Sequence, residues 1–172
     1  MQHFPIFLAT AGRRIVLSGG GEAALAKLRL LLKTPARITV FAAKPAPEIA
    51  AWAAAGKLEL RRQALQAGDL DGTALFYAAD EDAAEDARTA TLARAAGALV
   101  NVVDNLEDSD FITPAIVDRD PVTVAIGTEG AAPVLARAIK ADLEAQLGCP
   151  VWLGNDCNVA ATGIHRLELE AK

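Results

Sequence analysis

Apolar residues follow two different spacings along positions 1–105, and the two alternate. Short continuous apolar runs predict buried strands, whereas apolar residues at i, i+3, i+4 and i+7 predict one face of a helix. The predicted strands are 14–18, 36–43, 57–62, 74–79 and 98–104, and the predicted helices are 24–32, 48–55 and 80–97. This alternation predicts an α/β fold, a Rossmann-type parallel sheet with helices on both faces.

The pattern changes after Asp104. A polar loop leads into two strand-like runs at 111–118 and 121–127, which a tight turn joins into a β-hairpin. An amphipathic helix follows at 130–148, with Pro133 in its first turn and Gly148 at its end. We therefore expect three parts: a Rossmann domain at 1–105, a hairpin and helix at 106–148, and a tail at 149–172 without predicted structure.

Composition narrows the class of partner. The chain has 172 residues, 52% of them hydrophobic, and a net charge of -5 without any cluster of lysine or arginine. Nucleic acid is excluded because phosphate binding draws on grouped cations, so a small molecule is expected. Cys149 and Cys157 provide no disulfide framework, which favours the cytoplasm. The apolar start has no basic region and is too short to span a membrane, so no membrane partner is expected.

Three glycines separate the first strand from the first helix. Gly19-Gly20-Gly21-Glu22-Ala23-Ala24 matches G-x-G-x-x-A in that context. The first glycine permits a tight turn, the third lets a pyrophosphate approach the backbone, and Ala24 lets the helix pack closely on the sheet. The sequence therefore predicts a dinucleotide site, although glycines that merely form a tight turn would give the same letters.

The second predicted strand ends without the acidic residue that usually holds the ribose. Ala43 and Lys44 stand there instead. Lys44 would favour the 2′-phosphate of NADP, whereas backbone groups at both positions would serve NAD. An exposed lysine at a strand end is the alternative interpretation.

Asp104 ends the fifth predicted strand, at the edge where open α/β sheets bind ligands. Half-burial beside Val102 and Val103 would raise the pKa of its carboxyl and suit it to act as a general base or to hold a cation. A turn cap is the alternative. The acids of the 80–86 segment are interpreted as a solvated helix face, and no metal site is predicted.

Several segments together resemble a known family. "FPIF" at 4–7, "GGGEAALAK" at 19–27, "NVVD" at 101–104 and the stretch 111–137, which ends in "PVLAR", are similar to the N-terminal module of sirohaem synthase, the precorrin-2 dehydrogenase and sirohydrochlorin ferrochelatase family. The resemblance covers residues 1 to about 147. Its most specific parts are the triple glycine, the "NVVD" tetrapeptide and "PVLAR".

The resemblance implies an oxidoreductase that uses NAD to convert precorrin-2 into sirohydrochlorin. It implies as a second, lyase activity that the same cleft inserts ferrous iron, a substrate, to give sirohaem. By similarity, Asp104 is the catalytic carboxylate of both reactions, and the cofactor contacts are Gly19, Gly20, Gly21, Glu22, Ala23, Ala43 and Lys44. A non-catalytic module that senses NAD(H) or only binds the tetrapyrrole is the competing hypothesis.

The substrate carries many carboxylates, so a net-acidic protein needs local cations. Arg119 and Arg137 are the predicted contacts, with ordinary surface charge as the alternative. The family has a serine near the tetrapyrrole in the turn at 127–130, where Thr128 keeps a hydroxyl and Glu129 adds an anion. In the family the hairpin and last helix form a dimer, and the apolar hairpin agrees with that use, so a homodimer is expected.

Overall fold

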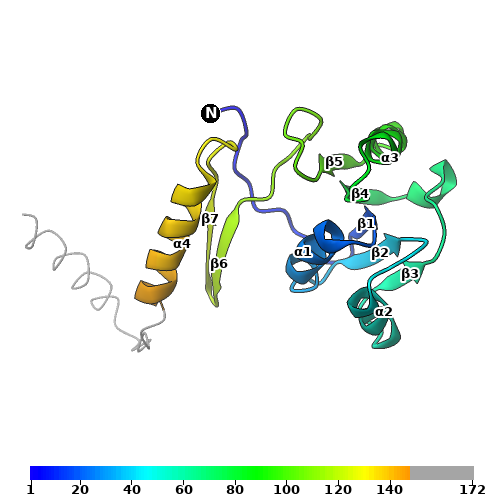
Figure 1. The fold of residues 1–172 in the computed structure, drawn as a ribbon. Coiled ribbons are helices and arrows are strands. Elements are labelled where there is room, and N and C mark those ends of the chain that lie inside the picture. The colour runs from blue at the N-terminus through cyan, green and yellow to red at the C-terminus, as the bar shows by residue number, and fades with distance from the viewer. Residues whose placement is uncertain (148–172) are drawn as a thin grey trace, which may run out of the picture. The chain divides into compact units, whose positions relative to one another are not determined.

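The protein is described here by a computed structural model, which covers residues 1–147 (Figure 1). It divides into two compact units, one of Met1–Thr113 and one that starts at Pro114. Each unit has its own sheet. In residues 1–147, no helix is long and apolar enough to cross a membrane. Cys149, Cys157 and the tail expected at 149–172 lie outside the described residues.

The first unit contains a five-stranded parallel sheet in the order β3-β2-β1-β4-β5 (Figure 1). Its strands are β1 (Arg14–Ser18), β2 (Arg37–Phe41), β3 (Glu59–Arg61), β4 (Thr73–Ala78) and β5 (Leu99–Val102). The chain runs outward from β1 to β3 and then returns to β4 on the other side of β1. This reversal is the switch point of a doubly wound sheet, so the predicted Rossmann fold is confirmed.

Helices cover both faces of this sheet. The helical elements are α1 (Glu22–Leu31), α2 (Pro47–Ala54), the 3-10 turn η1 (Ala67–Leu70) and α3 (Ala83–Ala95). Side chains of a strand alternate between faces, and accordingly Ile15 and Leu17 pack with α1 and α2, whereas Val16 packs with η1 and α3. β1 is therefore buried on both sides, which explains its continuous apolar run, whereas Glu59 and Arg61 of the edge strand β3 are exposed.

Three predicted elements extend too far toward the ligand-binding edge. The third long helix begins at Ala83 instead of 80, because Asp82 caps it. The fifth strand ends at Val102 instead of 104, where Asp104 turns to φ +60°. The second strand ends at Phe41 instead of 43. All three differences lie in turns whose backbone leaves the regular geometry.

Residues 106–113 belong to the first unit and pack on its sheet. The Asp110 carboxylate accepts the Val100 N–H at 2.9 Å, and the Asn101 side chain donates to the Phe111 carbonyl at 2.9 Å. The Phe111 ring meets Tyr77 edge-on, with centroids 5.4 Å apart. The compact unit thus continues past the end of β5 to Thr113.

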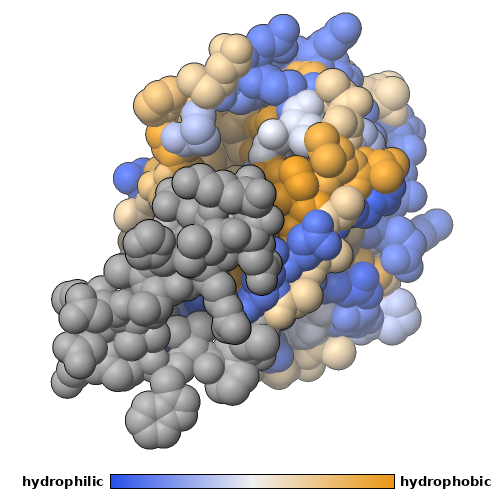
Figure 2. Space-filling view, turned by 90° about the vertical axis from the view of Figure 1, so that its left-hand side faces the viewer, coloured by the Kyte–Doolittle hydropathy of each residue, from blue (hydrophilic) through white to orange (hydrophobic). Residues whose placement is uncertain are grey.

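Up to residue 147, the second unit contains the predicted hairpin, β6 (Ala115–Arg119) with antiparallel β7 (Val122–Ile126), and α4 (Pro133–Leu147). Among residues 114–147, the buried hydrophobic side chains are Val117 and Ala136. Val134 is 69% exposed and Leu135 55%, so this unit presents apolar side chains on its helix. Figure 2 shows apolar residues at the protein surface among charged ones.

Candidate functional site

Gly19 stands at the carboxyl end of β1, where the chain turns into α1. Its φ is +133°, and a Cβ placed there would lie 2.0 Å from the Ala79 carbonyl oxygen. Its N–H donates to the Phe41 carbonyl at 2.9 Å. The glycine is therefore required by the close approach of β1 to the ends of β2 and β4, before any ligand is considered.

Gly20 faces the chain that leaves β2. A Cβ there would lie 2.8 Å from the Lys44 carbonyl oxygen, and the Gly20 carbonyl accepts the Ala46 N–H at 2.9 Å. Ala43 and Lys44 are exposed beside this contact. The fold thus brings the two positions predicted from the second strand against the glycine turn.

Gly21 is the N-cap of α1 and has no side chain to cap the helix. A Cβ there would lie 2.6 Å from Oε1 of Glu81, and the same oxygen accepts the Ala23 N–H at 2.9 Å. A helix N-terminus with free amides attracts anions. This turn therefore forms an anion cradle that fits the diphosphate of a dinucleotide, and the Glu81 carboxylate lies in it.

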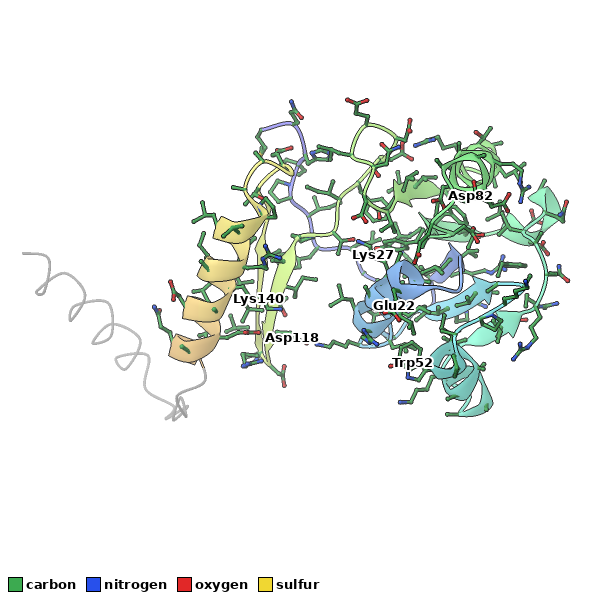
Figure 3. All side chains as sticks on the ribbon, viewed as in Figure 1. Glu22, Lys27, Trp52, Asp82, Asp118 and Lys140 are labelled. Atoms are coloured by element: carbon green, nitrogen blue, oxygen red, sulfur yellow. The ribbon has the colours of Figure 1, made fainter. Side chains whose placement is uncertain are left out.

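Glu81 comes from the turn after β4, and sequence reasoning missed it. The residue has φ +61°, which is uncommon for a side chain other than glycine, asparagine or aspartate. Its position directly after a strand of the sheet, at the ligand-binding edge, was the available signal. Exposed Glu22 belongs to the first turn of α1, as Figure 3 shows.

A pocket of about 220 Å³ opens at this edge of the first unit. Its lining comes from the ends of β4 and β5 and the starts of α1 and α3: Ala23, Ala79, Glu81, Asp86, Val103 and Asp104. The anion cradle and the predicted catalytic carboxylate therefore line one pocket. Because these residues are far apart in sequence, only the parallel sheet brings them together.

Asp104 is exposed at the mouth of this pocket, which contradicts the expected half-burial. The turn that carries it leaves β5 with φ +60° and so directs the side chain out of the sheet. In residues 1–147 its carboxylate accepts no hydrogen bond, so the alternative of a turn cap is not what the structure shows. The carboxylate is available to take a proton from a ligand.

Lys27 is a second residue that sequence reasoning left without a role. It lies on α1 (Figure 3) and is half-buried, and that burial lowers the pKa of its ammonium group while the charge of Asp104 raises it. The opposite charges on Lys27 and Asp104 therefore act on each other within the first unit. The signal was a lysine one turn after the apolar positions that face the sheet.

Of the acids that follow β4, Glu81 and Asp82 are exposed as predicted, whereas for Asp80 and Asp86 the interpretation as a solvated face was wrong. The Ser18 hydroxyl donates to half-buried Asp80 at 2.6 Å, and buried Asp86 accepts the Asp80 N–H at 2.9 Å. Burial raises the pKa of both carboxyls. Asp82 caps α3 by accepting the N–H groups of Ala84 and Glu85. The reason is that this segment crosses the edge of the sheet before the helix begins.

The predicted substrate contacts lie in the second unit. Exposed Arg119 ends β6 and donates to the Asp118 carbonyl at 3.0 Å, and exposed Arg137 is on α4. Half-buried Thr128 lies between β7 and α4, where its carbonyl accepts the Ala131 N–H at 2.9 Å. Their contact with substrate stays a prediction. Within residues 1–147, no group of three or more His, Cys, Asp or Glu side chains is arranged to hold a metal ion.

Comparison with known proteins gives three concordant results. A family model described as putative NAD(P)-binding matches residues 6–115. A protein of Chromobacterium violaceum named siroheme synthase is 48% identical over 144 residues, 84% of this chain and 31% of that protein. A siroheme synthase of Methylococcus capsulatus is 45% identical over 84% of this chain and 30% of its own length. The chain thus spans about a third of these relatives.

A solved structure shares the fold. The chain matches the structure named SirC, precorrin-2 dehydrogenase, with a TM-score of 0.71 and 30% identity over 84% of this chain and 71% of the other. The similarity therefore extends beyond the nucleotide-binding sheet.

Proposed function

The chain belongs to the NAD(P)-binding family matched at residues 6–115 and to the sirohaem synthase family, and we propose that it oxidises precorrin-2 to sirohydrochlorin with NAD. The observation that carries this proposal is that the anion cradle of α1 and the exposed carboxylate of Asp104 line the same pocket. A dehydrogenase needs a bound oxidant and an acceptor for the proton that leaves with the hydride, and these are the two features of the pocket.

Cofactor binding and proton transfer are carried out by different residues of the pocket. The amides of the turn at 19–23 and the adjoining backbone of Ala43 and Lys44 hold the dinucleotide, with the diphosphate at the N-terminus of α1. NAD supplies the hydride acceptor. Oxidation removes one hydride and one proton from the substrate, and an oxygen of the Asp104 carboxylate takes the proton and passes it to water. The reaction is then balanced, because the cofactor carries both electrons.

Lys27 supports this role of Asp104. Its ammonium group is the cation that acts on Asp104 from α1. The two opposite charges attract each other, so Lys27 helps to hold the Asp104 side chain at this edge of the sheet. The anionic substrate gains an attractive charge at the same edge of the sheet.

The test is turnover by Asp104→Asn, which keeps the size of the side chain and removes its basicity. We expect kcat to fall by about 100-fold or more, because positioned general bases contribute about 100- to 10,000-fold, with the Kd for NAD unchanged. NADH absorbance and sirohydrochlorin absorbance are followed together. Glu107→Gln is the matched control, since Glu107 is an exposed acid in the loop after β5, and it should retain wild-type turnover.

Other outcomes identify the competing functions. A chain that binds NAD but never forms NADH from precorrin-2 is a sensor, and one that changes the tetrapyrrole absorbance without forming NADH is a binding module. Turnover unchanged in Asp104→Asn would remove Asp104 from the mechanism. Ferrous iron added after the first step tests the second activity, in which the same Asp104 carboxylate accepts protons released from the macrocycle.

The same proposal assigns the second unit to dimerisation and substrate contact. Exposed apolar side chains at Val134, Leu135 and Val122 would be covered in a homodimer. Arg119, Arg137 and Thr128 would contact the substrate carboxylates. Sedimentation equilibrium measures whether the protein forms a homodimer. The KM of Arg137→Gln for precorrin-2 measures whether Arg137 contacts the substrate.

A further inference from the structure

The carboxylate of Glu81 lies at the N-terminus of α1, the part of the proposed cofactor site that would hold a diphosphate. Its Oε1 accepts the Ala23 N–H at 2.9 Å, in the first turn of α1, and it lies 2.6 Å from the position that a Cβ of Gly21 would take. Gly21 is the N-cap and brings no side chain of its own. The contact spans 58 residues of sequence, so it is tertiary and not a local cap.

The backbone at Glu81 holds it there. Its φ of +61° is a left-handed conformation that costs glutamate free energy, and it places the residue between β4 and the cap of α3. Asp80 on one side is bonded to Ser18, and Asp82 on the other caps α3. Both neighbours are fixed, so only the side chain of Glu81 is able to leave the cradle.

We propose that Glu81 is an internal competitor of the cofactor: its carboxylate occupies the diphosphate cradle and thereby sets the affinity for the dinucleotide. The inference rests on the proposed NAD site. Two anions that compete for the same N–H groups of a helix N-terminus repel each other, and the apparent Kd of the ligand rises in proportion as the fraction of molecules with a vacant cradle falls. Binding of the cofactor then requires Glu81 to turn outward, away from Ala23.

A cap alone is the simpler interpretation of the same contact. A residue that only caps α1 would stabilise the fold and leave the affinity for anions unchanged. A competitor weakens the binding of ligands with a diphosphate and has no effect on ligands without one. The phosphate dependence therefore separates the two roles.

The experiment compares wild type with Glu81→Ala and Glu81→Gln. Titration calorimetry gives the Kd for NAD, and displacement of NADH gives the inhibition constants of ADP and adenosine. A hydrogen bond contributes about 0.5–1.5 kcal/mol net, which corresponds to roughly two- to tenfold in affinity. We expect Glu81→Ala to bind NAD and ADP about three- to tenfold more tightly, with adenosine unchanged. Glu81→Gln should fall between the two, because it keeps an acceptor but loses the charge.

Glu85→Gln is the matched control, since it removes one negative charge from the first turn of α3 while its carboxylate is paired with Arg88 at 2.6 Å. Its affinity for NAD should equal that of wild type. If wild type binds NAD and neither Glu81 variant binds it more tightly, Glu81 is not a competitor, although the proposed cofactor site stands. Weaker binding of NAD by Glu81→Ala would lead to the same conclusion. If no protein binds NAD or ADP, the proposed cofactor site itself fails. Thermal unfolding confirms that each variant is folded.

Discussion

Two strand-to-helix turns meet at the switch point of the sheet. They differ in whether a side chain of the turn accepts the N–H groups at the start of its helix. The turn from β1 to α1 contains glycines and provides no side-chain cap. The turn from β4 to α3 contains acids, and Asp82 caps its own helix through two N–H groups. The start of α1 therefore leaves its N–H groups for an anion that comes from another segment or from a ligand. At the start of α3, Asp82 already accepts the N–H groups that such an anion would need. The comparison explains why, of these two helices, α1 is the one that offers backbone amides to a ligand.

The largest expected effect comes from Gly19→Ala. A Cβ at this position would lie 2.0 Å from a backbone oxygen, which no side-chain rotation relieves, and φ is +133°. We expect a loss of about 3 kcal/mol or more in the free energy of unfolding, measured by urea denaturation. Gly72→Ala is the control, because its φ of +68° comes with open space. Equal losses in the two variants would mean that the close approach of β1 and β4 does not require the glycine.

An intermediate effect is expected from Asp82→Ala. This change removes the acceptor of the Ala84 and Glu85 N–H groups and should cost about 1 kcal/mol of stability. Asp82→Asn retains an acceptor and should restore most of it. The affinity for NAD should change in neither variant. A loss of affinity in Asp82→Ala without loss of stability would show that the acidic turn, too, holds the ligand.

The smallest effect is a pH dependence of stability at Asp86. Burial raises the pKa of this carboxyl, so its contribution is fully present below the pKa of the unfolded chain, about 3.9, and is lost as pH rises through the folded value. Asp86→Asn removes that loss and should raise the Tm at pH 7. The corresponding gain in the free energy of unfolding is less than about 1 kcal/mol, and no gain is expected near pH 4. Thermal denaturation at both values measures it.

Glu85 provides a control of opposite sign on the same helix. The hydrogen bond from Arg88 lowers the pKa of its carboxyl, so its contribution is present above the unfolded pKa and lost as pH falls through the folded value. Glu85→Gln should therefore lower Tm at pH 7 and converge on wild type in acid. If Asp86→Asn behaved in the same way, burial would not be the dominant influence on Asp86.

The parallel sheet and the alternation of strands and helices along the chain could be predicted directly from the sequence. Residues that pack in the core around the sheet are apolar, so the core is visible in the sequence. The continuous apolar run Ile15–Leu17 indicates a buried strand, and the helical spacing of Leu25 and Leu28 indicates the buried face of a helix. The glycine turn and Asp104 were recognisable because each directly follows a strand. Turn geometry was less predictable: Glu81 and Asp104 both adopt positive φ, which is uncommon for glutamate and more readily adopted by aspartate.

The sequence by itself determined the alternation of strands and helices, the glycine turn before α1 and the carboxylate after the fifth strand, since each depends on residues adjacent in the chain. Only the tertiary structure decided that Glu81 lies at the N-terminus of α1, that Lys27 acts on Asp104, and that Asp80 and Asp86 are partly or wholly removed from water. Those contacts join side chains from different strands and helices, and their distances depend on the order and register of the parallel strands, which no local pattern records.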